Sequence, residues 1–468
     1  MIAANMGVNN YTRETSFLVA FGFTKALSNL LVGWASDRYG RRIPHIFGWS
    51  AGMILASLLL STDITTGDTV AGWTRYVIAD VFLGAQQGFA WTTNIFMFID
   101  ILGPEHRALA SGVSNSTGYL ASAIATYAAA ALTIELAFTL VLVSSVLGLS
   151  ISVFILKDTT HFVAREVVMY DDGYKVEEVV VAAECNGRSS TGKTTTGKAA
   201  NICADVSTDR TLQTKPLSQV LYPLEAPAAM PNHHTPSFRT TFAATSWHNR
   251  STFIICLSGL ITNLVTSLVC GLVMIWGKQR SLSKFRLANL SSAFTFAKAF
   301  SQIVFGHVSD RHRNRRLVLL CVFSTAAAGL ALTATGGATD LPLDGVYVRL
   351  LVGGLVTGCG IGSVYCVMTG AISDHTPPQE RASAIGVYKL WRDSGYAFGG
   401  LLTGLVADVS GGSFVITTLV VAGLVVVLIV LIAVYYCEAR CAPVTTPGEG
   451  SGDNSVRWHE LQNLEGIT

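Results

Sequence analysis

Apolar stretches of roughly 20 residues recur along this chain, with polar segments between them. A helix of that length crosses a hydrocarbon core of about 30 Å, so each stretch predicts a membrane-spanning helix. One set lies near 15–36, 43–61, 75–101, 108–133 and 136–156. A second set lies near 252–276, 287–308, 317–335, 346–373, 382–408 and 413–436. The pattern predicts an all-α polytopic membrane protein with eleven apparent transmembrane helices.

The two sets of stretches define the expected domains. Residues 1–156 form the first helical half, 251–436 form the second, and 437–468 form a cytoplasmic tail. Residues 157–250 are rich in Ser, Thr, Gly and Pro, and this polar composition predicts a largely disordered cytoplasmic linker.

The two halves resemble each other in sequence. FGFTKALSNLLVGWASDR at 21–38 aligns with FTFAKAFSQIVFGHVSDR at 294–311, at an offset of 273 that becomes 274 further along. The aligned charged pairs are Lys25 with Lys298, Asp37 with Asp310, Asp100 with Asp374, and Arg107 with Arg381. Two homologous halves joined by a polar linker are typical of secondary transporters.

The alignment also predicts one more helix than the chain contains. The stretch 252–276 opens the second half, and its counterpart 273 residues earlier would fall before Met1. The sequence therefore favours a twelve-helix protein whose first helix is missing, through a misplaced start or a true truncation. A genuine eleven-helix protein is the alternative.

Composition and charge narrow the class. Half of the 468 residues are apolar, only 13% are charged, and the mean hydropathy is +0.46, above what a soluble domain tolerates. A net charge of +2, with the basic residues in short clusters between apolar runs, does not support nucleic-acid binding. The basic loops at 38–42 and 311–316 lie on one side by helix count, so the positive-inside rule makes that side cytoplasmic. A basic loop at 278–286 opposes this orientation without reversing it.

Two loops, GWASDRYGRR at 33–42 and GHVSDRHRNRR at 306–316, carry the strongest motif. They resemble the loop between helices two and three of major facilitator superfamily transporters. The resemblance implies two pseudo-symmetric helical halves with a cytoplasmic gate, in which arginines bind carboxylates in fork geometry. The expected gate residues are Gly33, Asp37, Arg38, Gly40, Arg41, Arg42, Asp100, Arg107, Gly306, Asp310, Arg311, Asp374 and Arg381. Plain loop anchoring and structural salt bridges are the alternatives.

A polar stripe follows the predicted helix 75–101. Asp80, Gln87, Trp91 and Asn94 are spaced by seven, four and three residues, which places them on one helical face. In lipid such a stripe must face protein or water, so we expect it to line a substrate cavity. Two residues of the second half are expected to join it: Asn263, and Tyr365 at the position equivalent to Trp91. Interhelical hydrogen bonding is the alternative.

Charged residues interrupt the apolar run GVYKLWRDSGYAFGG at 386–400. Each costs roughly 2.5–3.5 kcal/mol at the bilayer centre, so it needs a partner or water. The run is similar to a bacterial-type subgroup of the superfamily with a Gly-Val-Tyr, Trp-Arg-Asp, Gly-Tyr signature in helix eleven. The fold that this implies packs Lys25 near Asp393, and we hypothesise an ion pair between them. The candidate substrate or coupling residues here are Lys25, Lys298, Tyr388, Lys389, Arg392, Asp393 and Tyr396, with a structural role as the alternative.

The resemblance implies secondary active or facilitative transport of a small solute by alternating access. A non-transporting receptor or scaffold, or a truncated inactive transporter, is the alternative. No nucleophile or metal constellation suggests an enzyme. The phosphate-loop-like GRSSTGKT at 187–194 is followed by a poor helix former, so no cofactor is expected. The expected partners are a small-molecule substrate and the lipid bilayer, with protons as a candidate coupling ion. We expect a monomer in the plasma membrane, with an organelle membrane as the alternative.

Overall fold

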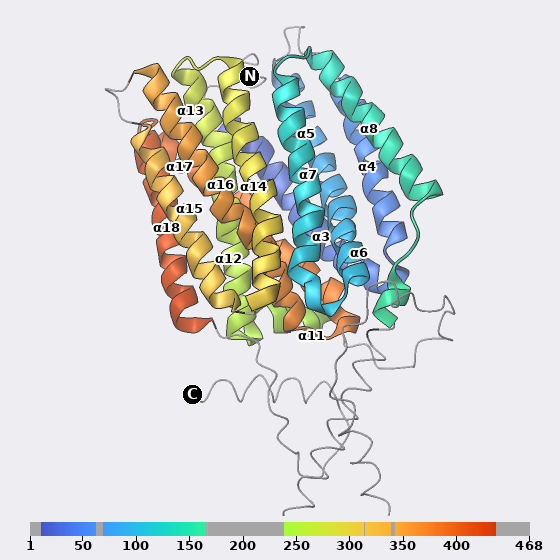
Figure 1. Cartoon of the computed structure of the whole chain (residues 1–468). Helices are drawn as coiled ribbons and strands as arrows, with labels where there is room; N and C mark the ends of the chain where they lie inside the picture. The colour runs from blue at the N-terminus through green and yellow to red at the C-terminus, as the bar shows by residue number, and fades with distance from the viewer. Residues whose placement is uncertain are drawn as a thin grey trace, which may run out of the picture.

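The computed structural model describes residues 11–61, 69–164, 166, 238–312, 314–337 and 342–436. In these residues every regular element is helical, and the long helices run side by side in one bundle (Figure 1). This is the expected response of long apolar segments to lipid, where each backbone polar group must find its partner within the protein.

The first half of the bundle contains five helical runs preceded by a short helix. One run is divided by a π-helical segment, η1, into α5 and α6. The elements are α2 Tyr11–Glu14, α3 Ser16–Tyr39, α4 Arg42–Leu60, α5 Thr69–Gln86, η1 Gln87–Trp91, α6 Thr92–Leu102, η2 Pro104–His106, α7 Arg107–Ala129 and α8 Ile134–Phe154.

The second half begins with two short helices at one end of the bundle. A π-helical segment, η5, divides its first long run. The elements are α11 Phe238–Ala243, η4 Ala244–His248, α12 Arg250–Ser267, η5 Leu268–Leu272, α13 Val273–Gln279, α14 Lys284–His312, α15 Arg315–Thr335, α16 Leu343–Asp374, η6 Pro378–Glu380, α17 Arg381–Val409 and α18 Phe414–Tyr435.

Seven of the described helices are long and apolar enough to cross a membrane: α3, α4, α8, the run from α12 to α13, α15, α16 and α18. The runs at α5 to α6, α7, α14 and α17 lie among them and bury polar side chains inside the bundle. The total of eleven spans stays a prediction.

Helix α18 shows why the bundle needs a nonpolar solvent. Its mean hydropathy of 3.2 exceeds that of the other candidate spans. One face buries Val421, Val425, Leu428 and Ile432, whereas the opposite face exposes Val426, Val427, Val430 and Val434. An exposed apolar face of this length is stable against lipid and not against water.

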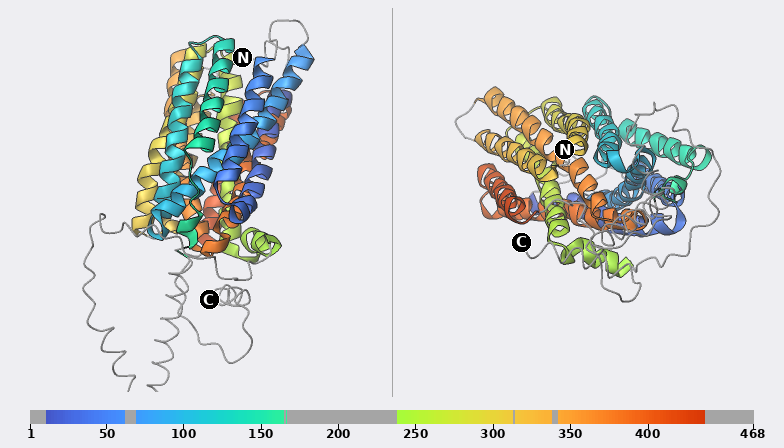
Figure 2. Two further views of the ribbon diagram at one scale, coloured as in Figure 1. Left: turned by 90° about the vertical axis from the view of Figure 1, so that its right-hand side faces the viewer. Right: turned by 60° about the horizontal axis from the view of Figure 1, so that its bottom comes forward.

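The two halves meet along α3 with α17 and along α7 with α14. Figure 2 shows the blue-to-cyan half beside the yellow-to-red half from two further directions. Gly33 allows the first contact, because a Cβ there would lie 2.6 Å from the carbonyl oxygen of Ala382. Small residues let helix backbones approach closely in membranes.

Helical structure in the second half begins before the expected boundary at 251. Helix α11 is tied to the bundle by a hydrogen bond from Thr241 to Glu380, and η4 by one from Trp391 to Ser246. The expected linker between 167 and 237, including 187–194, and the tail at 437–468 lie outside the described residues.

Candidate functional site

The two Asp-Arg loops lie at one end of the bundle, which we call the motif end. Gly40 makes the first loop possible: its φ is +81°, and a Cβ there would lie 2.3 Å from the Asp158 carboxylate. Asp158 accepts hydrogen bonds from the amides of Arg41 and Arg42 at the start of α4, at 2.7 and 3.1 Å. Burial raises the pKa of Asp158, but these bonds and those from Thr160 hold it below its usual range.

Each loop has an arginine that joins two carboxylates of its own half. Arg41 Nε lies 3.0 Å from Asp100, and its Nη1 lies 3.3 Å from Asp37. Arg315 makes the corresponding contacts, 2.7 Å to Asp374 and 3.3 Å to Asp310. Arg315 is absent from the predicted gate residues. The repeat could have found it, because the offset of 274 residues that aligns Arg107 with Arg381 also aligns Arg41 with Arg315.

Each loop aspartate also reaches the opposite half. Asp37 accepts from the amide and hydroxyl of Ser383 at 2.9 and 2.6 Å, at the start of α17. Asp310 accepts from the amides of Ala108 and Leu109 at 3.2 and 2.8 Å, at the start of α7. The first amides of a helix lack internal acceptors and attract negative charge. Each aspartate therefore caps a helix of the other half.

A further carboxylate, Glu166, joins two arginines from different halves. It accepts from Arg107 at 2.8 Å and from Arg381 at 2.7 Å. Arg107 also contacts the Ser373 carbonyl at 2.8 Å and Asp374 at 3.5 Å. Burial raises the pKa of Glu166, but the two guanidinium groups hold it below its usual range. No spacing in the sequence marked Glu166 as a gate residue.

Three predicted gate arginines lie outside these contacts. Arg38 is exposed and stacks on the rings of Trp34 and Tyr39, and Arg311 is exposed. Each directly follows its aspartate, and consecutive side chains do not share a helical face. Arg41 lies beyond the end of α3, where the turn at Gly40 brings its guanidinium back to Asp37. Arg42 turns instead to the carbonyl groups at the end of α8. Of the predicted glycines, Gly306 packs against Ala108, and a Cβ there would lie 3.0 Å from its carbonyl oxygen.

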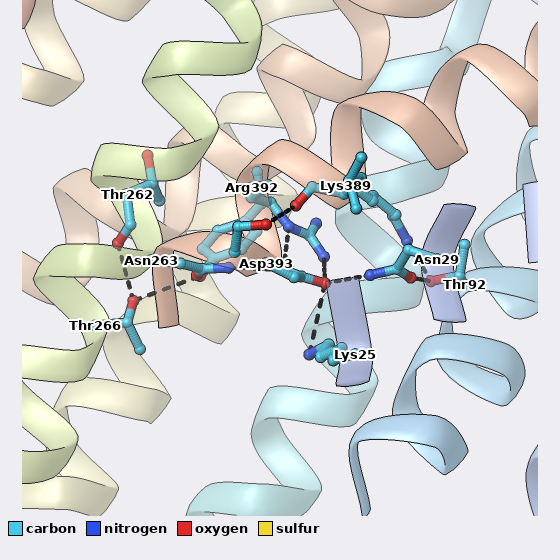
Figure 3. A network of polar contacts seen from close by, with 12 residues as sticks. Lys25, Asn29, Thr92, Thr262, Asn263, Thr266, Lys389, Arg392 and Asp393 are labelled. Atoms are coloured by element: carbon cyan, nitrogen blue, oxygen red, sulfur yellow. Dashed lines mark hydrogen bonds and ion pairs between the residues drawn. The ribbon is translucent and has the colours of Figure 1, made fainter. Parts of the chain in front are cut away.

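Halfway through the bundle, Asp393 is the centre of a buried polar network between the halves (Figure 3). Its carboxylate accepts from Arg392 Nε and Nη2 at 2.7 and 2.8 Å, and from Asn29 and Asn263 at 2.6 Å each. Lys25 Nζ lies 4.0 Å away. The hypothesised contact of Lys25 with Asp393 is thus present, but Arg392 is the closer partner.

The network continues into the first half through hydroxyl and amide groups. Lys25 donates to Gln87 at 2.8 Å, Thr92 donates to Asn29 at 2.5 Å, and Lys389 donates to Thr92 at 3.0 Å. Asn29 and Thr92 are new members. Asn29 lies four residues after Lys25, so the helical spacing that defined the polar stripe could have found it.

The predicted polar stripe is divided, because η1 adds a residue to one helical turn and shifts the register beyond it. Thr92 therefore enters the network, while Asn94 makes no hydrogen bond to its described members. Trp91 donates to Asn115 at 2.7 Å. Asp80 is buried two turns before Gln87, and its Oδ2 has no hydrogen-bond partner among the described residues. The four residues do not line one surface.

In the second half, Lys298 lies among hydroxyl groups and aromatic rings. Its Nζ lies 3.1 Å from Tyr365 Oη and 3.4 Å from Thr266 Oγ1. Its Nζ is also 4.5 Å from the ring centre of Tyr119 and 4.6 Å from that of Tyr365. Tyr365 in turn donates to Asn263, which joins Lys298 to the network around Asp393.

The two remaining predicted tyrosines flank the network cations. The Tyr396 ring centre lies 5.3 Å from Lys25 Nζ, and the Tyr388 ring centre lies 5.9 Å from the Arg392 guanidinium. The five charged members are almost completely buried, with exposed fractions of 5% for Lys25, 1% for Lys298, 0% for Lys389, 4% for Arg392 and 0% for Asp393. Among the described residues, no group of three His, Cys, Asp or Glu side chains could hold a metal ion.

Solved structures with the same fold are membrane transporters. The human organic anion transporter MFSD10 (TETRAN) matches with a TM-score of 0.59 and 13% identity, over 92% of this chain and 87% of that one. The proton:xylose symporter XylE, bound to 6-bromo-6-deoxy-D-glucose, matches with a TM-score of 0.59 and 11% identity, over 96% of this chain and 88% of that one. A search of curated proteins found no match.

The family assignment rests on most of the chain. Residues 11–168 and 252–462 match the Major Facilitator Superfamily, and these two ranges contain both Asp-Arg loops and the whole central network. The chain is therefore a member of the Major Facilitator Superfamily, whose proteins transport small solutes across membranes.

Proposed function

We propose that this chain carries a small solute across a membrane by alternating access, in which one helical half rocks against the other. The motif end is the cytoplasmic gate, and the halves are pseudo-symmetric and contain eleven spans in all. We also propose that the chain belongs to the bacterial-type subgroup of the superfamily, which the helix-eleven signature at 386–400 supports.

The observation that carries this proposal is the reciprocal capping at the motif end. Asp37 caps α17 of the second half, and Asp310 caps α7 of the first. Hydrogen bonds to a charged group contribute about 1.5–3 kcal/mol each. The two aspartate caps are therefore strong enough to hold the gate closed and weak enough to break in each transport cycle. A large apolar contact between the halves would be harder to separate.

The opposite end of the bundle is also closed between the halves. Asp408 of α17 accepts from the amides of Tyr11 and Thr12 at 3.2 Å each. The Tyr11 hydroxyl donates to Gln279 at 2.7 Å. Contacts at both ends enclose the buried network around Asp393, which is the arrangement expected of an occluded state. Transport then requires the two ends to open in turn.

The two similar transporters do not select a substrate, because one carries organic anions and the other xylose with protons. At 13% and 11% identity the likeness concerns the fold alone. The chain's own residues must indicate the substrate.

The direct test is solute uptake by the full chain in proteoliposomes. The vesicles are incubated with a metabolite extract, and their contents are compared by mass spectrometry with those of protein-free vesicles. We expect saturable accumulation of at least one solute. A solute that binds the protein but never enters the vesicles would support a receptor and overturn transport.

The gate is tested with two matched double variants in the same loops. Asp37→Asn with Asp310→Asn removes both caps, and Arg38→Gln with Arg311→Gln alters exposed neighbours. We expect the first to change the ratio of closed to open gate by about 10-fold or more. Hydrogen exchange at the amides of Ala108, Leu109 and Ser383 should then become faster. Equal exchange in both variants would show that the caps do not hold the gate.

A further inference from the structure

The central network contains more positive than negative charge. Lys25, Lys298, Lys389 and Arg392 surround one carboxylate, Asp393, and all five are buried. The next interior carboxylate, Asp80, lies seven residues before Gln87 on the same run, about 10 Å along the axis. No described lysine or arginine lies within 4 Å of Asp80. Buried cations without counter-charge are costly in a membrane, so the excess requires an explanation.

The Asp393 carboxylate cannot neutralise the other cations, because it is already fully bonded. Each of its oxygens accepts one hydrogen bond from Arg392 and one from an asparagine, Asn263 or Asn29. Lys25 is the one lysine in contact with it, at 4.0 Å. Lys389 has a threonine hydroxyl at 3.0 Å.

The aligned lysines of the two halves therefore have different surroundings. Lys25 has a carboxylate near it, whereas Lys298 has the hydroxyl groups of Tyr365 and Thr266. No carboxylate among the described residues lies within 4 Å of Lys298 or Lys389. Hydroxyl groups supply hydrogen-bond acceptors without supplying charge, so Lys298 keeps its capacity to bind an anion.

Aromatic rings connect these two lysines across the boundary between the halves. Trp91 and Tyr119 come from the first half and Tyr365 from the second, and neighbouring ring centres are 5.2 and 5.9 Å apart. Lys25 Nζ lies 5.7 Å from the Trp91 ring, and Lys298 Nζ lies 4.6 Å from the Tyr365 ring. The three rings form a continuous aromatic row that ends at Lys298.

We infer that the substrate is a small organic anion, a carboxylate with an aromatic body, held by Lys298 beside the rings of Trp91, Tyr119 and Tyr365. This inference rests on the proposed transport function. The carboxylate supplies the missing negative charge, and the aromatic body stacks on side chains that prefer offset or edge-to-face ring contacts. Because Tyr119 and Tyr365 belong to different halves, the bound anion touches both moving parts.

The test compares three probes with nearly the same shape: phenylacetate, its amide, and phenethylamine. Binding to the purified full chain is measured by equilibrium dialysis, and uptake is measured in proteoliposomes. We expect phenylacetate to bind and enter, the amide to bind about 10- to 100-fold more weakly, and the amine not to bind. Lys298→Gln should weaken phenylacetate binding by a similar factor. The control Lys284→Gln changes an exposed lysine of the same helix and should have no effect.

The two measurements separate this inference from the proposed function. Phenylacetate that binds through Lys298 but does not enter would leave the anion site intact and overturn transport. Uptake of the amide or amine in preference to phenylacetate would leave transport intact and overturn the substrate class. Equal binding of phenylacetate to Lys298→Gln and Lys284→Gln, or no binding of phenylacetate, would also overturn the anion site.

Discussion

Replacing Asp393 with asparagine tests whether one carboxylate holds the centre of the bundle together. The substitution keeps the shape of the side chain and removes its charge. It leaves the guanidinium of Arg392, which donates to the two carboxylate oxygens at 2.7 and 2.8 Å, buried without its counter-charge. The two asparagines that donate to Asp393 also lose their charged acceptor.

The expected loss follows from the removal of one partner of a buried ion pair, which costs about 3–5 kcal/mol. That is about a 150- to 4000-fold reduction in the ratio of folded to unfolded protein. Removing both partners leaves no uncompensated charge, so Asp393→Asn with Arg392→Gln should be less destabilised than Asp393→Asn alone. The coupling energy of the pair is the loss in the double variant minus the sum of the losses in Asp393→Asn and Arg392→Gln, so both single variants are measured.

The assay is the free energy of unfolding in mixed micelles, and Asp80→Asn is the matched control. Asp80 is also a buried aspartate, but no described cation lies within 4 Å and one of its oxygens has no hydrogen-bond partner in the described part of the chain. Asp80→Asn removes a buried carboxyl group that has no described cation beside it. The free energy of unfolding should therefore stay unchanged or rise. Equal destabilisation by the two substitutions would refute the reasoning, because burial alone would then explain the effect.

Three further outcomes follow from the same contacts. Gly40→Ala places a Cβ at φ +81° against Asp158 and should lower the unfolding free energy by about 1–3 kcal/mol, measured in the same micelles. The lowered pKa of Glu166 means that its contribution to stability is complete above the usual carboxyl range and is lost as pH falls through the lowered value. The protection of amides near Arg107, taken as the observed exchange rate relative to the intrinsic rate at each pH, should therefore be flat from about pH 8 to 6. Glu166→Gln should abolish the loss of protection seen in acid. The charge swap of Lys25→Asp with Asp393→Lys should fail to restore stability, since it places a lysine beside Arg392; full rescue would show that Lys25 is the main partner of Asp393.

The sequence predicted the helical bundle and many of its important charges, because membrane segments obey strong and simple constraints. A long apolar run must be a helix, and an interior charge must find a partner. The second constraint, together with the fold that the family resemblance implies, indicated the contact of Lys25 with Asp393, which the structure contains at 4.0 Å. The repeat offset likewise marked Asp37 and Asp310, whose caps on the opposite halves share one geometry. The roles of these residues in transport remain predictions.

The errors have a common physical source, which is local backbone geometry that charge patterns do not reveal. A strict 3.6-residue period assigned Asn94 to the central face, but the π-helical turn at Gln87–Trp91 rotated Thr92 into the network instead. Arg38 and Arg41 were both predicted as gate residues, but the turn at Gly40, where φ is +81°, brings Arg41 to Asp37 and leaves Arg38 exposed.

Long-range partners were harder to predict than either of these. Glu166 follows a turn after α8, and its contact with Arg381, 215 positions away, depends on how the halves are packed. A carboxylate with no periodic neighbour gives no signal in a single sequence. The same limit applies to Lys298, whose sequence environment matches that of Lys25 while its three-dimensional surroundings lack a described carboxylate. The repeat predicts that the two lysines are equivalent in position, and packing makes them different in chemistry.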